Sequence, residues 1–153
     1  MSLLTTGTIL TLSDTDTAGT SLLPFYSARG LTQTMSHIGA AKVQRRTVNF
    51  ELVNLALTRA QKYASVISAN DVRPPSRDDV WPGKIVVVGC AYLLSYPTSG
   101  GSPSRGVVFG SRQDDGHGFT FYQPSITFMI GDLHGSFEEW EAGYGWSIPM
   151  EEV

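Results

Sequence analysis

Apolar side chains alternate with polar ones along several short stretches of this chain, a pattern typical of half-buried β-strands. The longest such stretch runs from Glu138 to Met150, where an apolar or aromatic residue recurs at every second position from Trp140 onward. The segment from Lys84 to Tyr96 is apolar at both alternating sets of positions, which predicts a central strand covered on both faces. The residues predicted to be nearly fully buried in it are Val86, Val88 and Cys90.

Shorter strands are predicted elsewhere, separated by turns rich in Gly, Pro, Asn and Asp. These strands are Thr8 to Leu12, Arg105 to Ser111 and Phe119 to Ile130. The intervening loops are Asn70 to Gly83 and Pro97 to Ser104, with a hairpin tip from Arg112 to Gly118. Pro124 interrupts the last strand, which predicts a bulge or an edge position there.

One segment, Arg46 to Leu57, gives mixed signals. Its first apolar residues alternate as in a strand, whereas a later set recurs at helical spacing. The strand-like set is Val48, Phe50 and Leu52, and the helical set is Val53, Leu57, Ala60 and Ala64. We therefore expect at most one short helix, near residues 51–64, and leave a strand open as the alternative.

Six or more short strands predict an all-β or mainly β fold, either a sandwich or a small barrel. The length of 153 residues fits a single domain, residues 1–153. Residues 1–35 contain turn formers, few apolar runs and Pro24, so we expect an irregular, extended N-terminal arm with edge strands that buries little. Residues 84–153 form the β-rich half of the core.

Composition excludes several classes of protein. With 41% hydrophobic residues, the chain is too apolar to be mainly disordered. Cys90 is the single cysteine, which excludes an intrachain disulfide scaffold and a zinc ribbon. No stretch approaches the roughly 20 apolar residues of a membrane span. Residues Met1 to Leu12 lack the basic start of a secretory signal, so we expect a soluble protein without a membrane partner.

The net charge of −3 conceals a strong asymmetry along the chain. All 11 Lys and Arg residues lie between Arg29 and Arg112, and residues 1–112 carry a net charge of +5. Residues 113–153 contain 8 acidic residues and no basic ones. This separation favours contact with a basic partner or with the basic part of a neighbouring copy. The alternative is that the two parts neutralise each other within one molecule.

The segment Gly131-Asp132-Leu133-His134-Gly135 follows an apolar strand and resembles the opening motif of the calcineurin-like metallophosphatases. The resemblance implies that Asp132 and His134 would ligate one of two metals that activate water. That family takes its other ligands from later motifs, whereas the 18 residues after Gly135 contain no His, Asn or Asp. We therefore interpret the motif as a turn between two strands and expect no bound metal.

Other candidate residues have no partners in the sequence. Asp14 and Asp16 resemble the start of an EF-hand loop, but its twelfth position is Phe25 instead of Glu. Cys90 lies in an apolar strand, where a thiol is usually inert, and His117 lies at a predicted hairpin tip. We therefore assign no catalytic, cofactor-binding or metal-ligating residue, expect no cofactor, and predict a protein that is not an enzyme.

Two further groups of side chains could bind a ligand. The basic cluster is Lys42, Arg45 and Arg46. Nucleic acid would require more positive charge and interleaved aromatic residues, so the sequence argues against it. The aromatic group, which could stack on sugars, is Trp81, Trp140, Trp146 and Tyr144. We expect these rings to be buried in the β core.

Four stretches carry a wider resemblance. They are a Thr-, Ser- and Gly-rich start ending in Phe25 to Thr34, the segment Arg45 to Asn49, the turn region from Arg73 to Gly83, and the close from Trp140 to Val153. In these stretches the chain resembles the small virion structural proteins of tailed bacteriophages. The resemblance implies a structural subunit that assembles in the bacterial host cytoplasm and resides in the virion, with copies of itself and other virion proteins as partners.

The predicted function is therefore a non-enzymatic subunit of a phage tail or head–tail junction, favoured over a capsid decoration protein. It would act through self-association and docking. The alternative is a ligand-binding β-sandwich that recognises carbohydrate or a receptor, which the aromatic residues would support. Oligomeric state separates the two, because a ring or lattice favours the subunit and a monomer with an aromatic platform favours the binding module.

Overall fold

A computed structural model describes residues 10–15, 21–23, 31–70, 75 and 78–153 of the chain. Within these ranges the protein is mainly β, its sheets are antiparallel and no α-helix occurs. The predicted mainly β class is therefore confirmed. No helix among the same residues is long and apolar enough to cross a membrane.

Eight strands form the main sheet, in the order β1-β6-β11-β13-β5-β2, with β12 paired to β13 and β8 paired to β11. Their bounds are β1 (Thr11–Asp14), β2 (Thr32–His37), β5 (Tyr63–Asn70), β6 (Ile85–Gly89), β8 (Gly106–Val107), β11 (Pro124–Ile130), β12 (His134–Glu138) and β13 (Gly143–Glu152). Strands β1 and β2 are therefore the first and last strands of this order.

One face of the main sheet carries the core, because buried side chains recur at every second position of its central strands. Cross-strand pairs on this face include Ile148 with Ile67 and Phe128 with Val86, and all four side chains are fully buried. Burying a side chain of this kind stabilises the fold by roughly 1.5–3 kcal/mol. The alternation predicted for β13 is therefore confirmed from Trp146 onward.

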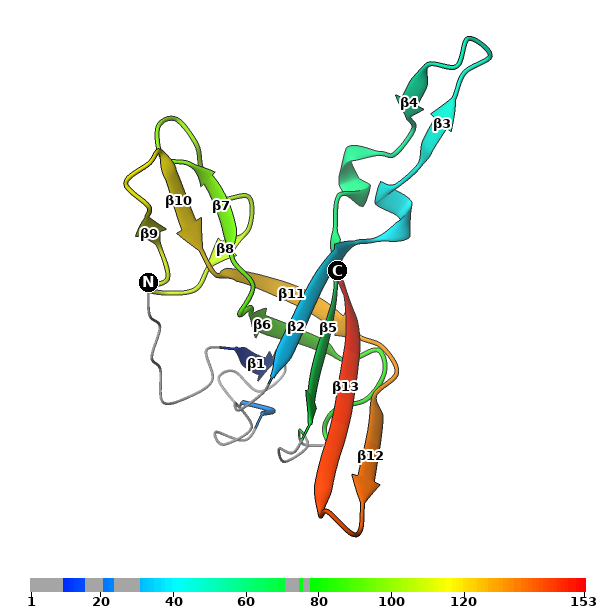
Figure 1. The fold of residues 1–153 in the computed structure, drawn as a ribbon, viewed down its shortest axis with the longest axis vertical. Helices are drawn as coiled ribbons and strands as arrows, with labels where there is room; N and C mark the ends of the chain where they lie inside the picture. The colour runs from blue at the N-terminus through cyan, green and yellow to red at the C-terminus, as the bar shows by residue number, and fades with distance from the viewer. Residues whose placement is uncertain (1–9, 16–20, 24–30, 71–74, 76–77) are drawn as a thin grey trace.

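The two halves of the main sheet cross one another. In Figure 1, β2, β5 and β13 run along the long axis of the view, and β6 and β11 cross that direction. Gln33 on β2 joins the halves: its side-chain oxygen accepts hydrogen bonds from the N–H groups of Ala91 (2.8 Å) and Tyr92 (3.2 Å), just beyond β6. Its amide group donates to Ser65 Oγ on β5 (3.2 Å). The core is therefore enclosed between the two halves.

Two smaller sheets extend from this core (Figure 1). The first, in the order β7-β10-β9, consists of β7 (Leu94–Pro97), β9 (Gln113–Asp114) and β10 (Phe119–Tyr122), and we call residues 94–122 the second lobe. The other is a two-stranded hairpin of β3 (Gln44–Arg46) and β4 (Leu52–Asn54). Two single turns of 3₁₀-helix, Gly39–Ala41 and Thr58–Ala60, lie on either side of this hairpin.

The strand predicted from Lys84 to Tyr96 is divided between two sheets. It forms β6 in the main sheet and β7 in the second lobe. Val86, Val88 and Cys90 are fully buried, as predicted. Strand β6 pairs with β1 on one side and with β11 on the other, so the prediction of a central strand is confirmed. Ile85 and Val87 are only half-buried, so the prediction that both faces are covered is wrong. The continuous apolar run arises because two strands of different sheets follow each other closely.

The strand predicted from Phe119 to Ile130 also divides, at Gln123 between β10 and β11. Pro124 is the first residue of β11, a position where its missing N–H costs no ladder hydrogen bond. The prediction of a strand from Arg105 to Ser111 is confirmed only for β8. It is wrong beyond β8, because the chain turns there and leaves Phe109 fully exposed.

The short helix expected near residues 51–64 does not form. These residues form β4, a turn of 3₁₀-helix and the start of β5. An amphipathic helix gains most of its stability from packing its apolar face. Leu57 is exposed and Val53 only half-buried, so such a face would find little to pack against within the described residues. Strand β5 was not predicted, because its buried positions include the small residues Ser65 and Ala69.

Part of the segment expected to form an N-terminal arm lies outside the described residues, including Thr8, Ile9 and residues 24–30. In the described part, a hydrogen bond from the N–H of Leu22 to the C=O of Leu12 (2.8 Å) holds the chain against β1. The expectation that residues 1–35 bury little is wrong for four leucines, because the chain around β1 and at residues 21–23 packs into the core. These are Leu10, Leu12, Leu22 and Leu23.

Candidate functional site

A large exposed apolar surface belongs to residues 38–62. We call this segment the arm; it is distinct from the N-terminal arm expected over residues 1–35. Its base is closed by a hydrogen bond from the N–H of Ile38 to the C=O of Lys62 (3.1 Å), and its far part is the β3–β4 hairpin. No residue of the arm is buried. Figure 1 shows it reaching away from the main sheet. Its exposed large apolar side chains are Val48, Phe50, Leu52, Leu55 and Leu57.

The tip of the arm holds a bulky residue in a strained backbone conformation. The N–H of Phe50 bonds to the C=O of Thr47 (2.9 Å), and the N–H of Thr47 bonds to the C=O of Glu51 (2.9 Å). Phe50 has φ 65°, a left-handed conformation that suits Gly and costs other residues roughly 1–2 kcal/mol. Its side chain is 79% exposed. The turn alone therefore does not favour a Phe at this position, and its exposed ring is a candidate for contact with a partner.

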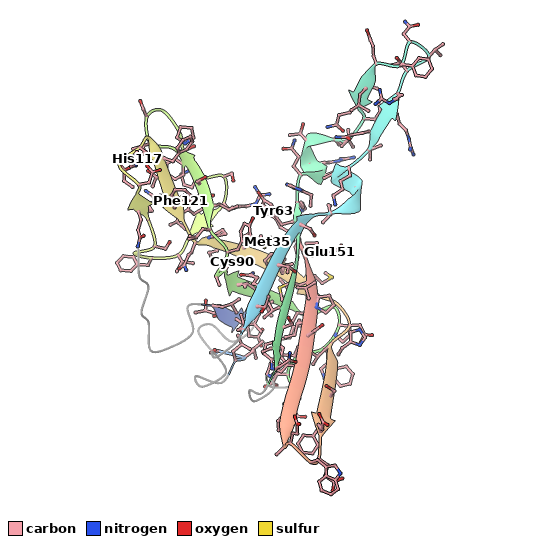
Figure 2. The ribbon with its side chains drawn as sticks, viewed as in Figure 1. Met35, Tyr63, Cys90, His117, Phe121 and Glu151 are labelled. Carbon is pink, nitrogen blue, oxygen red and sulfur yellow. The ribbon has the colours of Figure 1, made fainter. Side chains whose placement is uncertain are left out.

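A charged cluster fixes the arm to the core. Arg105 Nε lies 2.7 Å from Glu152 Oε1, and Arg105 Nη2 donates to the C=O of Gln61 (2.8 Å) at the base of the arm. The N–H of Tyr63 donates to Glu152 Oε2 (2.9 Å), and the Arg105 guanidinium lies 5.2 Å from the centre of the Tyr63 ring. Figure 2 shows Tyr63 at this junction. The arm therefore leaves the core in a defined direction.

A second exposed surface lies on residues 132–145, which we call the acidic hairpin. It contains four acidic residues and no Lys or Arg, and every residue of β12 is exposed. The rings of Phe137 and Tyr144 lie 4.7 Å apart across β12 and β13. Trp140 is 97% exposed in the turn between these strands, where Ala142 has φ 49°. Like the arm, this hairpin exposes aromatic side chains and has a non-Gly residue in the left-handed conformation.

A hollow of about 820 Å³ lies against the acidic hairpin. Asn70 of β5 lines it on one side, and both Phe137 and Tyr144 contribute to its wall. The acidic residues that line it are Glu138, Glu139 and Glu141. Negative charge next to aromatic surface fits a partner that is basic and apolar.

The metallophosphatase-like motif lies at the start of the acidic hairpin. Asp132 follows β11 and His134 begins β12, so the motif is a turn between two strands, as predicted. His134 Nε2 lies 3.8 Å from Asp132 Oδ2, and both side chains are more than 70% exposed. Among the described residues, no group of three or more His, Cys, Asp and Glu side chains could hold a metal ion. The absence of bound metal remains a prediction.

Two other candidates have structural roles. Asp14 is buried on β1 and its carboxylate lies 2.7 Å from Lys84 Nζ, whereas Asp16 and Phe25 lie outside the described residues. His117 lies at the hairpin tip of the second lobe, where Figure 2 labels it. Its backbone N–H donates to Asp115 Oδ1 (2.7 Å), which shapes the turn. The hairpin tip predicted from Arg112 to Gly118 is therefore confirmed for residues 115–118, whereas Gln113 and Asp114 form β9.

Cys90 is fully buried at the end of β6. Burial raises the pKa of its thiol, and the charge of Glu152 acts in the same direction, while a hydrogen bond with Gln33 opposes the rise. The thiolate is the nucleophilic form of cysteine. A buried thiol that resists ionisation does not fit a catalytic nucleophile.

The aromatic residues expected to lie in the core are mostly exposed. Trp146 is buried, but Trp81 and Trp140 are exposed and Tyr144 is 41% exposed. The expectation is wrong for these three because burial requires a facing element. Trp140 lies in the turn beyond the end of the sheet, so the alternation of β13 does not extend to it.

The arm and the acidic hairpin carry opposite charges. The arm contains five basic residues and one acidic residue, of which Lys42, Arg45 and Arg46 are the basic cluster identified in the sequence. The sequence did not predict that this cluster lies on a projecting segment with exposed apolar side chains. The alternation of Val48, Phe50 and Leu52 was the one feature of the sequence that pointed to it.

Comparison of the chain with known protein families, with curated proteins and with solved structures gives no match.

Proposed function

We propose that this protein is a non-enzymatic structural subunit of a tailed-phage virion that acts through self-association and docking. A tail or head–tail position is favoured over capsid decoration. The observation that supports docking is the arm, which exposes five large apolar side chains. The assignment to a phage virion rests on the resemblance of the sequence to small virion structural proteins. The protein would assemble in the host cytoplasm beside other virion proteins.

The energetics of the arm favour a partner. Burying one exposed Val, Leu or Phe side chain contributes roughly 1.5–3 kcal/mol, and the arm exposes five such side chains. In a monomer, none of them stabilises the fold, and Phe50 adds backbone strain. In an assembly, the same side chains would supply most of the free energy of association.

A second candidate function, carbohydrate or receptor binding, is favoured by the exposed aromatic rings of the acidic hairpin. Phe137, Trp140 and Tyr144 offer surfaces on which sugar rings could stack. This function needs a monomer or a small oligomer with these rings accessible. Quenching of Trp fluorescence by simple and oligomeric sugars, lost in Trp140→Ala, would support it over the structural subunit.

The test of the structural subunit is a matched pair of substitutions. Phe50→Asn should keep the tip turn, because Asn tolerates the left-handed conformation, and should remove the ring. We expect an unchanged or slightly higher melting temperature and an association constant about 10- to 100-fold lower. Sedimentation velocity of the full chain over a range of concentrations measures the association constant.

The control is Phe109→Asn, since Phe109 is fully exposed in the second lobe. It should leave the association constant unchanged. If the intact protein stays monomeric at high concentration, and labelled antibody against it finds no site on phage particles, the structural-subunit proposal fails. Labelling at the tail or the neck of the particle would support it, and labelling across the capsid shell would favour a decoration protein.

A further inference from the structure

We infer that the acidic hairpin is the docking site for the arm of a second copy of this chain. The inference rests on the proposed function, because it names the partner and the surface through which copies would associate. Such a contact is heterologous: the arm of one copy docks on the hairpin of the next, so each copy contributes both surfaces.

Charge complementarity selects the second copy as the partner. The arm has a net charge of +4 and the acidic hairpin a net charge of −4, counting His134 as neutral. The described structure gives Arg45 of the arm and Glu138 and Glu141 of the hairpin no ion pair within their own molecule. Opposite net charges on two surfaces steer them together and fix their orientation.

The two surfaces also match in their apolar content. The arm exposes aliphatic side chains and the ring of Phe50, and the hollow beside the acidic hairpin has Phe137 and Tyr144 in its wall. Within the described residues β12 pairs only with β13, so its outer edge offers backbone N–H and C=O groups to an added strand. Strands β3 and β4 of the arm have similar unpaired edges and could supply that strand.

The geometry excludes a contact within one molecule. Figure 1 shows the arm and the acidic hairpin at opposite ends of the longest axis, with β5 and β13 between them. An arm therefore reaches a hairpin only on another copy. A contact between opposite ends repeats from copy to copy, and it closes into a ring if the rotation between copies allows, or otherwise continues as a stack.

The experiment uses three charge-reversed forms of the full chain. The arm variant is Lys42→Glu, Arg45→Glu and Arg59→Glu, which changes the net charge of the arm from +4 to −2. The hairpin variant is Glu138→Lys, Glu139→Lys and Glu141→Lys, which changes the net charge of the hairpin from −4 to +2. The third form combines both sets. All of these side chains are exposed, so folding should be kept, and circular dichroism checks it. Arg112→Glu, an exposed reversal in the second lobe, is the control. Sedimentation velocity in low and high salt measures the assembled mass.

We expect the arm variant and the hairpin variant each to stay monomeric, because each carries like charge on both surfaces. Mixing the two should restore assembly, since the reversed arm fits the reversed hairpin and the unchanged arm fits the unchanged hairpin. The combined form should assemble alone, and Arg112→Glu should behave as the intact protein. High salt should weaken the rescue but not abolish it, because apolar contacts remain.

Two outcomes overturn the inference in different ways. If the intact protein assembles and the variants assemble equally well, or if mixing restores nothing, the arm does not dock on the hairpin, and self-association by another surface stands. If the intact protein does not assemble at any concentration, the proposed function fails together with this inference.

Discussion

Val88 and Val48 are the same residue type in opposite environments. Val88 lies on β6 with no exposed surface, paired with Ile126 of β11, whereas Val48 lies near the tip of the arm and is 97% exposed. Both occur in stretches whose pattern predicts a strand, a continuous apolar run around Val88 and an alternation around Val48. The difference shows that such a pattern does not say whether its apolar side chains meet another element of the same chain. In the arm, the part of the chain that the structure describes leaves Val48 exposed.

The largest effect should come from placing a charge at each of these two valines. Val88→Asp should prevent folding, because an unpaired charge in the core costs several kcal/mol of a total stability of about 5–15 kcal/mol. Val48→Asp should melt like the intact protein and should weaken association. Thermal denaturation followed by circular dichroism tests both. A soluble, cooperatively melting Val88→Asp variant would show that β6 does not contribute to the core as described.

The next effect concerns the junction between core and arm. Glu152→Ala should lower the free energy of unfolding by about 1–3 kcal/mol, because Arg105 and the N–H of Tyr63 lose their shared acceptor. Glu151→Ala, at the exposed neighbouring position, should cost under about 0.5 kcal/mol. Urea denaturation measures both variants. Equal effects would mean that the cluster does not hold the base of the arm.

A smaller effect should appear at alkaline pH through Cys90. Its thiol has a pKa raised by burial above the ordinary value of 9.0, so the fold retains a proton that the unfolded chain releases. Stability from this group is therefore complete below pH 9.0 and falls as the pH rises, with a slope of at most about 1.4 kcal/mol per pH unit. Urea denaturation between pH 8 and pH 10.5 should show this slope, and Cys90→Ala should lose it.

The smallest effect is expected at the tip of the acidic hairpin. Ala142→Gly should raise the free energy of unfolding by about 0.5–1 kcal/mol, because Gly adopts the left-handed conformation without strain. Ala60→Gly, in a turn of 3₁₀-helix, should instead lower it by a similar amount. A stabilised Ala142→Gly variant would show that Ala142, like Phe50 of the arm, occupies a position whose backbone conformation favours Gly.

The sequence was sufficient for the class of fold and for several individual elements. The alternation from Trp146 to Met150, the hairpin tip around His117 and the burial of Val86, Val88 and Cys90 all follow from local pattern. The alternation and the hairpin tip depend on neighbours within a few residues, and the burial of a run of consecutive apolar residues is what their residue types predict. The interpretation of Asp132 and His134 as a turn between strands also depended on nearby residues alone.

The candidate site could be predicted only in part. The charge separation and the cluster of Arg45 and Arg46 are visible in the sequence. The exposure of Leu55 and Leu57 is not, because apolar residues at that density are expected to be buried. The aromatic residue Trp140 was expected in the core for the same reason, and it lies beyond the end of its sheet.

The sequence alone therefore determined that this chain forms mainly β structure, that its polar turns separate the strands, and that positive and negative charge lie on different segments. Only the tertiary structure decided that the run from Lys84 to Tyr96 serves two sheets and that five large apolar side chains of the arm stay exposed. The physical reason is that a strand's local pattern follows from its own residues, whereas burial depends on which distant segment lies opposite.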